Sequence, residues 1–367
     1  MSRLALAVLV LALTVAGCGI AGTPKVEAPV TVYVSLPMTG PHGGEGRDAA
    51  DGVRLALEGA QGKAGSIQVR AVYLDDARGK VWDSVAVGAN ARRAVQDSSA
   101  AAYIGELDSE PTRASVPITN NAGLVQVSPG AGGVDLTQPA AGYPNTPDRY
   151  QPSGSPNFAR TVPADDVVVD AAANWASELG ATKAAVRSDG SAFQNLAASE
   201  FKAAAAEHGI PLGEPTQVAG DAQADVRFVY NPAGGNLSGY GKAARSLRVS
   251  AQLDPKLLPD KNFDTAFAQR FHRGPGVYAA YGYEAMGLVL QAIGGAGTDA
   301  SSFRDNVRNG VFGAQRDGTI LGSYSITSDG DTTECAIQRY RIERGASVGV
   351  GAFGLVTVPL GAPCPPS

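Results

Sequence analysis

The stretch of residues 102–137 constrains the fold more strongly than any other part of the chain. Two short apolar runs, residues 102–104 and 124–127, each end at a cluster of small and polar residues. Such runs are typical of buried parallel strands. The residues between them, 112–122, are enough for one helix. The stretch therefore predicts a strand, a crossover helix and a second strand, with the carboxyl ends of both strands at one edge of a sheet.

The predicted edge offers hydroxyl groups and bare backbone, at Ser109, Ser128, Gly130 and Gly132. Ligands of open α/β sheets bind at the carboxyl ends of the strands. The hydroxyl of Ser109, at a helix N-terminus, suits a carboxylate, and the carbonyl of Gly130 suits an ammonium group. No nucleophile with a neighbouring base stands at this edge. The pattern therefore predicts binding rather than catalysis.

Two α/β lobes are predicted, because 367 residues are too many for one ordinary hydrophobic core. Strands alternate with helices in residues 30–158, which is typical of a doubly wound lobe, and residues from about 256 to 325 are predicted to rejoin it. The second lobe is predicted to comprise residues from about 159 to 255 and from about 326 to 367.

The carboxy-terminal region contains a turn signal and a glycine motif. Residues 319–326 and 336–342 are predicted to pair as antiparallel strands, with a turn at Asp329 and Gly330. Residues 349–354 match the dinucleotide-binding pattern GxGxxG literally. That motif requires a helix directly after it and an acidic residue about 20 positions later, and the remaining sequence supplies neither. We therefore predict no nucleotide cofactor.

The order of motifs along the chain resembles that of a known family. Ile-Gly at residues 104–105, Ser109, Val-Ser-Pro-Gly at 127–130 and Asp-Leu-Thr at 135–137 carry the resemblance, together with residues 36–41, 74–76, 90–92, 160–165 and 281–285. This set is similar to the branched-chain amino acid binding proteins of ABC importers, which are type I periplasmic binding proteins. The resemblance covers most of the chain. It implies two doubly wound lobes joined by hinge crossings, with a small ligand between them.

The resemblance also implies ligand contacts, with departures from the family pattern. Gly132 stands where a threonine is usual, and Glu45 replaces an aromatic residue of the first loop. Phe193 aligns with an aromatic residue that covers the ligand, although it could instead lie in the core of its lobe, as could Tyr230 at a strand end. The predicted ligand-binding residues are Glu45, Ser109, Ser128, Gly130, Gly132, Phe193 and Tyr230.

The predicted second lobe is shortened. The family places a helix, a strand with an acidic ligand-binding residue and another helix after the strand that ends at Tyr230, but only sixteen residues precede the next apolar run, 247–251. Glu45, Asp108 or Asp189 could replace the missing acid as the partner of an ammonium group. Alternatively, the ligand is not a branched-chain amino acid.

The first residues predict export and a lipid anchor. A positive start and a short apolar run precede Val-Ala-Gly-Cys at residues 15–18, which resembles the lipobox of bacterial lipoproteins. Residues 1–17 are then a signal peptide, Cys18 carries the lipid and residues 18–29 form a tether. The alternative is an ordinary signal peptide with an incidental cysteine. The expected location is the outer face of the bacterial cytoplasmic membrane.

Two further cysteines, Cys335 and Cys364, form an even pair in a chain expected to be exported. Such a pair suggests a disulfide that fixes the proline-rich tail, and two free thiols are the alternative.

The sequence favours a solute-binding lipoprotein of an ABC importer, with an amino acid or a similar small polar ligand and the permease subunits as partners. A net charge of −5 and the lack of a Lys/Arg run argue against nucleic acid as a partner. One of the two acids Asp75 and Asp76 is interpreted as the cap of the following turn, in preference to an acid/base pair formed by both. No enzyme activity and no metal are predicted. The alternative function is a surface lipoprotein of the same fold that acts as a sensory or protein-interaction module.

Overall fold

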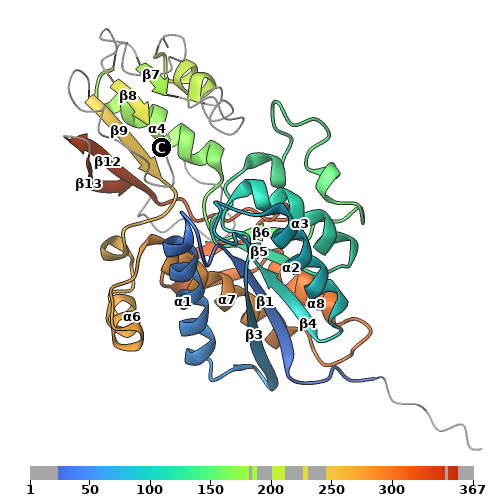
Figure 1. Cartoon of the computed structure of the whole chain (residues 1–367). Helices are drawn as coiled ribbons and strands as arrows, with labels where there is room; N and C mark the ends of the chain where they lie inside the picture. Colours follow the sequence, from blue (N-terminus) through green and yellow to red (C-terminus); the bar gives the residue numbers. More distant parts are fainter. Residues whose placement is uncertain are drawn as a thin grey trace, which may run out of the picture.

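The structure, a computed structural model, describes residues 24–181, 184–187, 201–210, 226–229, 245–343 and 346–353. Two sheets form the centres of two lobes (Figure 1). The first sheet has the strand order β2-β3-β1-β4-β5-β6, and all its pairs are parallel except the short edge pair β2-β3. Its strands are β1 (Val30–Leu36), β2 (Lys63–Ala64), β3 (Ile67–Asp75), β4 (Ala100–Ile104), β5 (Gln126–Ser128) and β6 (Phe158–Arg160).

Helices cover both faces of the first sheet because its strands are apolar on both sides. Val30, Val32 and Val34 of β1 pack into one core, and Tyr33, between them, packs into another. The helices on the valine side are α1 (Gly43–Gly59), α6 (Phe263–Phe271), α7 (Val277–Gly295) and α8 (Phe303–Val311). Those on the tyrosine side are α2 (Ser84–Gln96) and α3 (Ser109–Asn121). This arrangement is a doubly wound α/β lobe.

The second sheet has the order β13-β12-β9-β8-β7. Its strands are β7 (Ala184–Arg187), β8 (Val226–Val229), β9 (Arg245–Ser250), β12 (Ile337–Glu343) and β13 (Ala346–Phe353). Helix α4 (Asp165–Glu178) packs Val168, Ala172 and Trp175 into the core of this lobe. Strands β8 and β9 pair directly and in parallel. In the sequence they are separated by residues 230–244.

Three segments carry the chain between the two sheets (Figure 1). Residues 161–164 connect β6 to α4, and residues 251–254 lead from β9 to the short helix η3 (Pro255–Leu257). Residues 326–336 connect β11 (Gly322–Ser325) to β12. Strand β11 itself pairs with β10 (Gln315–Thr319) in a separate hairpin.

The predicted pairing of residues 319–326 with 336–342 is wrong. Strand β12 pairs with β9 and β13 instead. The turn signal is nevertheless real, because the Gly330 N–H donates to the Thr327 carbonyl and Gly330 has a φ of 98°. The turn lies inside the crossing segment, which then continues to the second sheet. Residues 349–353 of the glycine motif lie in the antiparallel strand β13, where no nucleotide-binding turn is formed.

Helices α1 and α7 cross at a very short distance because a glycine of each helix lies against the backbone of the other helix. A Cβ atom on Gly52 would lie 1.9 Å from the carbonyl oxygen of Ala279, and one on Gly282 would lie 2.1 Å from that of Ala49. Asp48 adds a polar contact, since its two carboxylate oxygens accept hydrogen bonds from the N–H groups of Gly276 and Ala279 at 2.9 and 3.1 Å. The helix pair therefore depends on these two glycines.

Replacement of Gly52 by alanine should destabilise the protein by about 1–3 kcal/mol, because the added methyl group forces two backbones apart. Gly59→Ala is the matched control in the same helix, since a Cβ atom there meets nothing within 4 Å. The control should be neutral or stabilising by up to about 1 kcal/mol. Denaturant unfolding measures the change in unfolding free energy of both variants. Equal changes at Gly52 and Gly59 would contradict the proposed close packing of the helices.

Candidate functional site

The structure brings five of the predicted ligand-binding residues to one edge of the first sheet. Strands β1, β4 and β5 are parallel neighbours, so the segments that follow them share this edge. Glu45 lies in the first turn of α1, Ser109 begins α3 and Ser128 ends β5. Gly130 and Gly132 lie in the loop of residues 129–133, which we call the glycine loop.

The two serine hydroxyls hold the glycine loop in place. Ser128 donates to the carbonyl oxygen of Glu106 at 2.6 Å and accepts from the N–H groups of Ala131 at 2.8 Å and Gly130 at 3.2 Å. The hydroxyl of Ser109 accepts from the N–H of Gly133 at 2.9 Å. The N–H groups of Gly130, Ala131 and Gly133 are thus bound inside the protein.

Close packing explains both glycines of the loop. A Cβ atom on Gly130 would lie 2.5 Å from the carbonyl oxygen of Leu107 and 3.2 Å from the ring of Tyr278. At Gly132 it would lie 2.3 Å from a carboxylate oxygen of Asp165, which is in the first turn of α4. The side chain of Asp165 therefore takes the space that a threonine at position 132 would need, which accounts for this departure from the family pattern.

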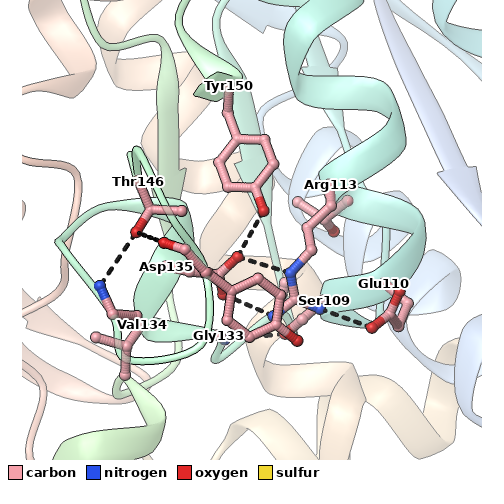
Figure 2. A network of polar contacts seen from close by, with 12 residues as sticks. Ser109, Glu110, Arg113, Gly133, Val134, Asp135, Thr146 and Tyr150 are labelled. Atoms are coloured by element: carbon pink, nitrogen blue, oxygen red, sulfur yellow. Dashed lines mark hydrogen bonds and ion pairs between the residues drawn. The ribbon is translucent and has the colours of Figure 1, made fainter. Parts of the chain in front are cut away.

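A buried ion pair fixes the segment after the glycine loop against α3 (Figure 2). The guanidinium of Arg113 donates to both carboxylate oxygens of Asp135, at 2.7 and 2.6 Å, and Tyr150 donates to the same carboxylate at 2.7 Å. The side chain of Asp135 is fully buried and that of Arg113 is 9% exposed. Glu110 contacts Arg113 from the solvent side at 3.1 Å.

Loss of the Asp135 carboxylate should destabilise the protein strongly. Asp135→Ala leaves the buried charge of Arg113 without its main partner, which costs about 3–5 kcal/mol. Glu110→Gln removes only the half-exposed partner of the same arginine and should cost less than about 1 kcal/mol. Thermal or denaturant unfolding distinguishes the two variants. A similar small loss of unfolding free energy in both variants would show that the Arg113–Asp135 ion pair does not hold the loop in place.

Charged side chains surround Glu45 at this edge. His42 Nδ1 lies 3.4 Å from a carboxylate oxygen of Asp108 and 3.6 Å from one of Glu45. The contact with Asp108 raises the pKa of His42, and burial raises the pKa of Glu45. Tyr278, in the first turn of α7, is 5% exposed, and burial, followed by the charges of Asp108 and Glu45, raises its pKa well above the usual value.

Arg248, on β9 of the second lobe, acts on two residues at this edge through its charge. Its positive charge acts to lower the pKa of both Glu45 and Tyr278, which belong to the first lobe. Arg248 and Tyr340 are cross-strand partners on β9 and β12, and the guanidinium carbon lies 4.6 Å from the centre of the Tyr340 ring. No local pattern in the sequence marks Arg248, Tyr278 or Tyr340, because their neighbours come from distant strands and loops.

Comparison with known proteins identifies the family. The family model described as "Periplasmic binding protein" matches residues 29–233, which is more than half of the chain. The chain belongs to the periplasmic binding protein family. No curated protein sequence matches it.

Solved structures of periplasmic binding proteins share the fold. A leucine binding protein from Thermotoga maritima is 19% identical, with a TM-score of 0.70 over 89% of this chain and 99% of that one. A solute binding protein from Rhodopseudomonas palustris, in complex with 3,4-dihydroxybenzoic acid, has the same identity and TM-score over 89% and 98%. An isoleucine complex from Streptococcus pneumoniae is 18% identical, with a TM-score of 0.68 over 88% and 98%. The predicted type I periplasmic binding fold is confirmed.

Several predicted residues of this family member lie outside the described part of the chain. They are Cys18, Phe193, Tyr230 and Cys364, together with Asp189 and the predicted signal peptide. Cys335 is 8% exposed in the crossing before β12. No helix of the described residues combines the length and the apolar character that crossing a bilayer requires.

The adjacent acids Asp75 and Asp76 have different roles. Asp75 caps a turn, as predicted, because its carboxylate accepts from the N–H groups of Met38, Ala77 and Arg78. Asp76 is 1% exposed, and neither of its carboxylate oxygens has a hydrogen-bond partner within the described residues. Burial, then the nearby charges of acids including Glu106, raises the pKa of Asp76 to about 9.

Glu106 is a second buried acid beneath the candidate site. It is fully buried, and burial raises its pKa to about 7 although its carboxylate accepts hydrogen bonds from the hydroxyls of Tyr103 and Ser115. Both Asp76 and Glu106 therefore hold protons more tightly in the folded chain than in the unfolded chain.

The stability that Asp76 contributes should fall as the pH rises. Its folded pKa lies above the unfolded value of about 3.9, so the contribution is complete below pH 4 and is lost as the pH rises through about 9. Relative to Asp76→Asn, the wild type should lose up to about 1.4 kcal/mol per pH unit between pH 5 and 9. Unfolding curves at several pH values test this. A difference in unfolding free energy between wild type and Asp76→Asn that stays constant with pH would contradict this prediction. Glu27→Gln, which changes an exposed acid, is the control.

Proposed function

We propose that this protein is the extracytoplasmic solute-binding component of an ABC importer and binds an amino acid or a similar small polar ligand between its lobes. The observation that carries the proposal is the edge of the first sheet, where Glu45, Ser109, Ser128 and the glycine loop come together at the carboxyl ends of parallel strands. Family membership supports it, and the relatives are solved with amino acids or aromatic acids.

The two-lobed fold supports a mechanism of ligand capture. A ligand that contacts both lobes stabilises the arrangement in which they are close together, and a permease can distinguish this arrangement from the open one. The crossing segments of residues 161–164, 251–254 and 326–336 are the elements about which the lobes would move. Binding then selects a conformation, and no bond in the ligand is broken.

The proposal includes membrane attachment through Cys18 and a disulfide between Cys335 and Cys364. The lipobox supports the anchor, because cleavage before Cys18 leaves a cysteine to which acyl chains are added. The burial of Cys335 supports a structural role for its sulfur. Intact-mass measurement of the membrane-extracted protein, with and without reduction, tests both features. A mature chain without acyl mass, or with free thiols at both positions, would contradict them.

Ligand binding should raise the thermal stability of the purified protein. A ligand present at 100 times its dissociation constant stabilises the folded state by about 2.7 kcal/mol. Thermal-shift measurements should therefore detect at least one member of a panel of amino acids, amino acid amides and benzoates. Lysozyme under the same conditions controls for general solvent effects. If no compound of the panel raises the melting temperature, the proposal is contradicted.

A further inference from the structure

A cavity of about 410 Å³ lies in the first lobe, away from the candidate site. Its walls come from residues 155–156, which precede β6, from the end of α8 with the residues that follow it, and from Ser328 in the crossing of residues 326–336. The candidate site lies at the carboxyl ends of the parallel strands, whereas residues 155–156 lie before the amino end of β6. The cavity is therefore at the opposite edge of the sheet from the glycine loop.

We propose that this cavity is a second binding site, for a small organic anion that carries a carboxylate on an apolar body. The carboxylate binds to the guanidinium of Arg308, and the apolar body packs on Phe312 and Pro156. The volume of the cavity is in the range of small-molecule sites. This assignment goes beyond the proposed function, because the space between the lobes takes no part in it.

Arg308 supplies the positive charge of the cavity. Its side chain is 20% exposed, and its Nη2 lies 3.3 Å from a carboxylate oxygen of Asp305, one turn earlier on α8. Asp305 is 61% exposed, so this ion pair is weak. Within the described residues the guanidinium makes no hydrogen bond. Its planar group therefore keeps the paired donors that a carboxylate needs.

The other polar side chains of the cavity favour an anion as well. Ser155, Asn309 and Ser328 are exposed, and in the part of the chain that the structure describes their side chains have no hydrogen-bond partner. Hydroxyl and amide groups can donate to an anion without adding charge. Of the described residues that line the cavity, Arg308 alone is charged. A carboxylate ligand therefore meets donors and no lining acid.

The apolar side chains of the cavity favour an organic ligand over an inorganic ion. Phe312, which directly follows α8, packs against the core of the first lobe and remains partly exposed, as does Pro156. An inorganic anion leaves this apolar surface in water, whereas an aromatic or aliphatic body covers it. Charge and apolar surface together therefore select an organic carboxylate.

Hydrogen bonds hold the walls of the cavity in place. The side-chain amide of Asn120 donates to the carbonyl oxygen of Ser155 at 2.8 Å. The Gly313 N–H donates to the Ile326 carbonyl oxygen at 2.9 Å, and the Ile326 N–H donates to that of Ala314 at 2.9 Å. These bonds attach the end of α8 to the crossing segment. The cavity is thus formed before a ligand arrives, which lowers the cost of binding.

The test locates a ligand on the full chain by photoaffinity labelling. A benzoate that carries a diazirine is crosslinked, and mass spectrometry of the peptides should place the label at residues 308–312 and at residues 155–156 or 328. Competition against the label on residues 308–312 then measures affinity at this cavity, whatever binds between the lobes. Benzoate should compete at least about tenfold better than benzamide, which lacks the charge, or acetate, which lacks the ring.

Three variants test the role of the guanidinium. Arg308→Gln should weaken benzoate at this site at least about tenfold, because the charged donor is lost. Asp305→Asn should strengthen benzoate about two- to fivefold, because it releases Arg308 from its ion pair. Arg92→Gln, at an exposed arginine of α2, is the matched control and should leave the affinity within about twofold. Unliganded melting curves verify that each variant is folded.

The results can overturn the assignment in three ways. The label is absent from the peptides of the cavity, or benzamide or acetate competes as well as benzoate, or Arg308→Gln leaves the affinity for benzoate unchanged. A solute that binds between the lobes labels other peptides, so the proposed function stands if this assignment fails. A tighter complex with Asp305→Asn supports binding at Arg308, because a merely structural role of the ion pair predicts no gain in affinity.

Discussion

The fully buried guanidinium of Arg160 connects the glycine loop to a crossing segment. It donates to the carbonyl oxygens of Ala131 and Gly133 at 3.2 and 3.0 Å and forms an ion pair of 2.8 Å with Asp331, in the crossing of residues 326–336. A buried cation is tolerated only when its donors are bound, so these partners must stay together. Because Thr137 also donates to Asp331, the glycine loop and the crossing behave as one unit. The crossing that leads to the second lobe is therefore held directly against the segment that forms the candidate site.

The local sequence correctly predicted the helices and strands whose positions depend only on the burial of their apolar residues. Strand β4 contains the predicted residues 102–104, β5 overlaps the predicted 124–127, and α3 lies between them at the predicted helix, because these segments are buried. The pairing of β12 was not predictable in this way. Its partner β9 lies almost 90 residues away, with Gln338 opposite Ser250, whereas the turn at Gly330 gives a purely local signal. The error therefore lies in the pairing and not in the turn.

The candidate site was predictable to the extent that strand ends are predictable. Ser109, Ser128 and the glycine loop follow directly from the alternation of strands and helices. The sequence could not show that the serine hydroxyls bind the loop's own N–H groups, since those contacts join residues 24 positions apart in the case of Ser109 and Gly133. Arg248 carries no local mark either, because its contact is with Tyr340 on a strand distant in the sequence.

Asp76 and Glu45 differ in burial and in nearby charges, and therefore in their effect on a ligand. Asp76, with a pKa of about 9, is protonated near neutral pH and adds little to the field at the sheet edge. Glu45 is only partly buried, and the positive charges of His42 and Arg248 oppose the rise in its pKa. A ligand ammonium group beside Glu45 would act in the same direction as Arg248, because a nearby cation favours the ionised carboxylate. Asp76 thus remains neutral, while Glu45 is the acid whose charge a bound cation strengthens.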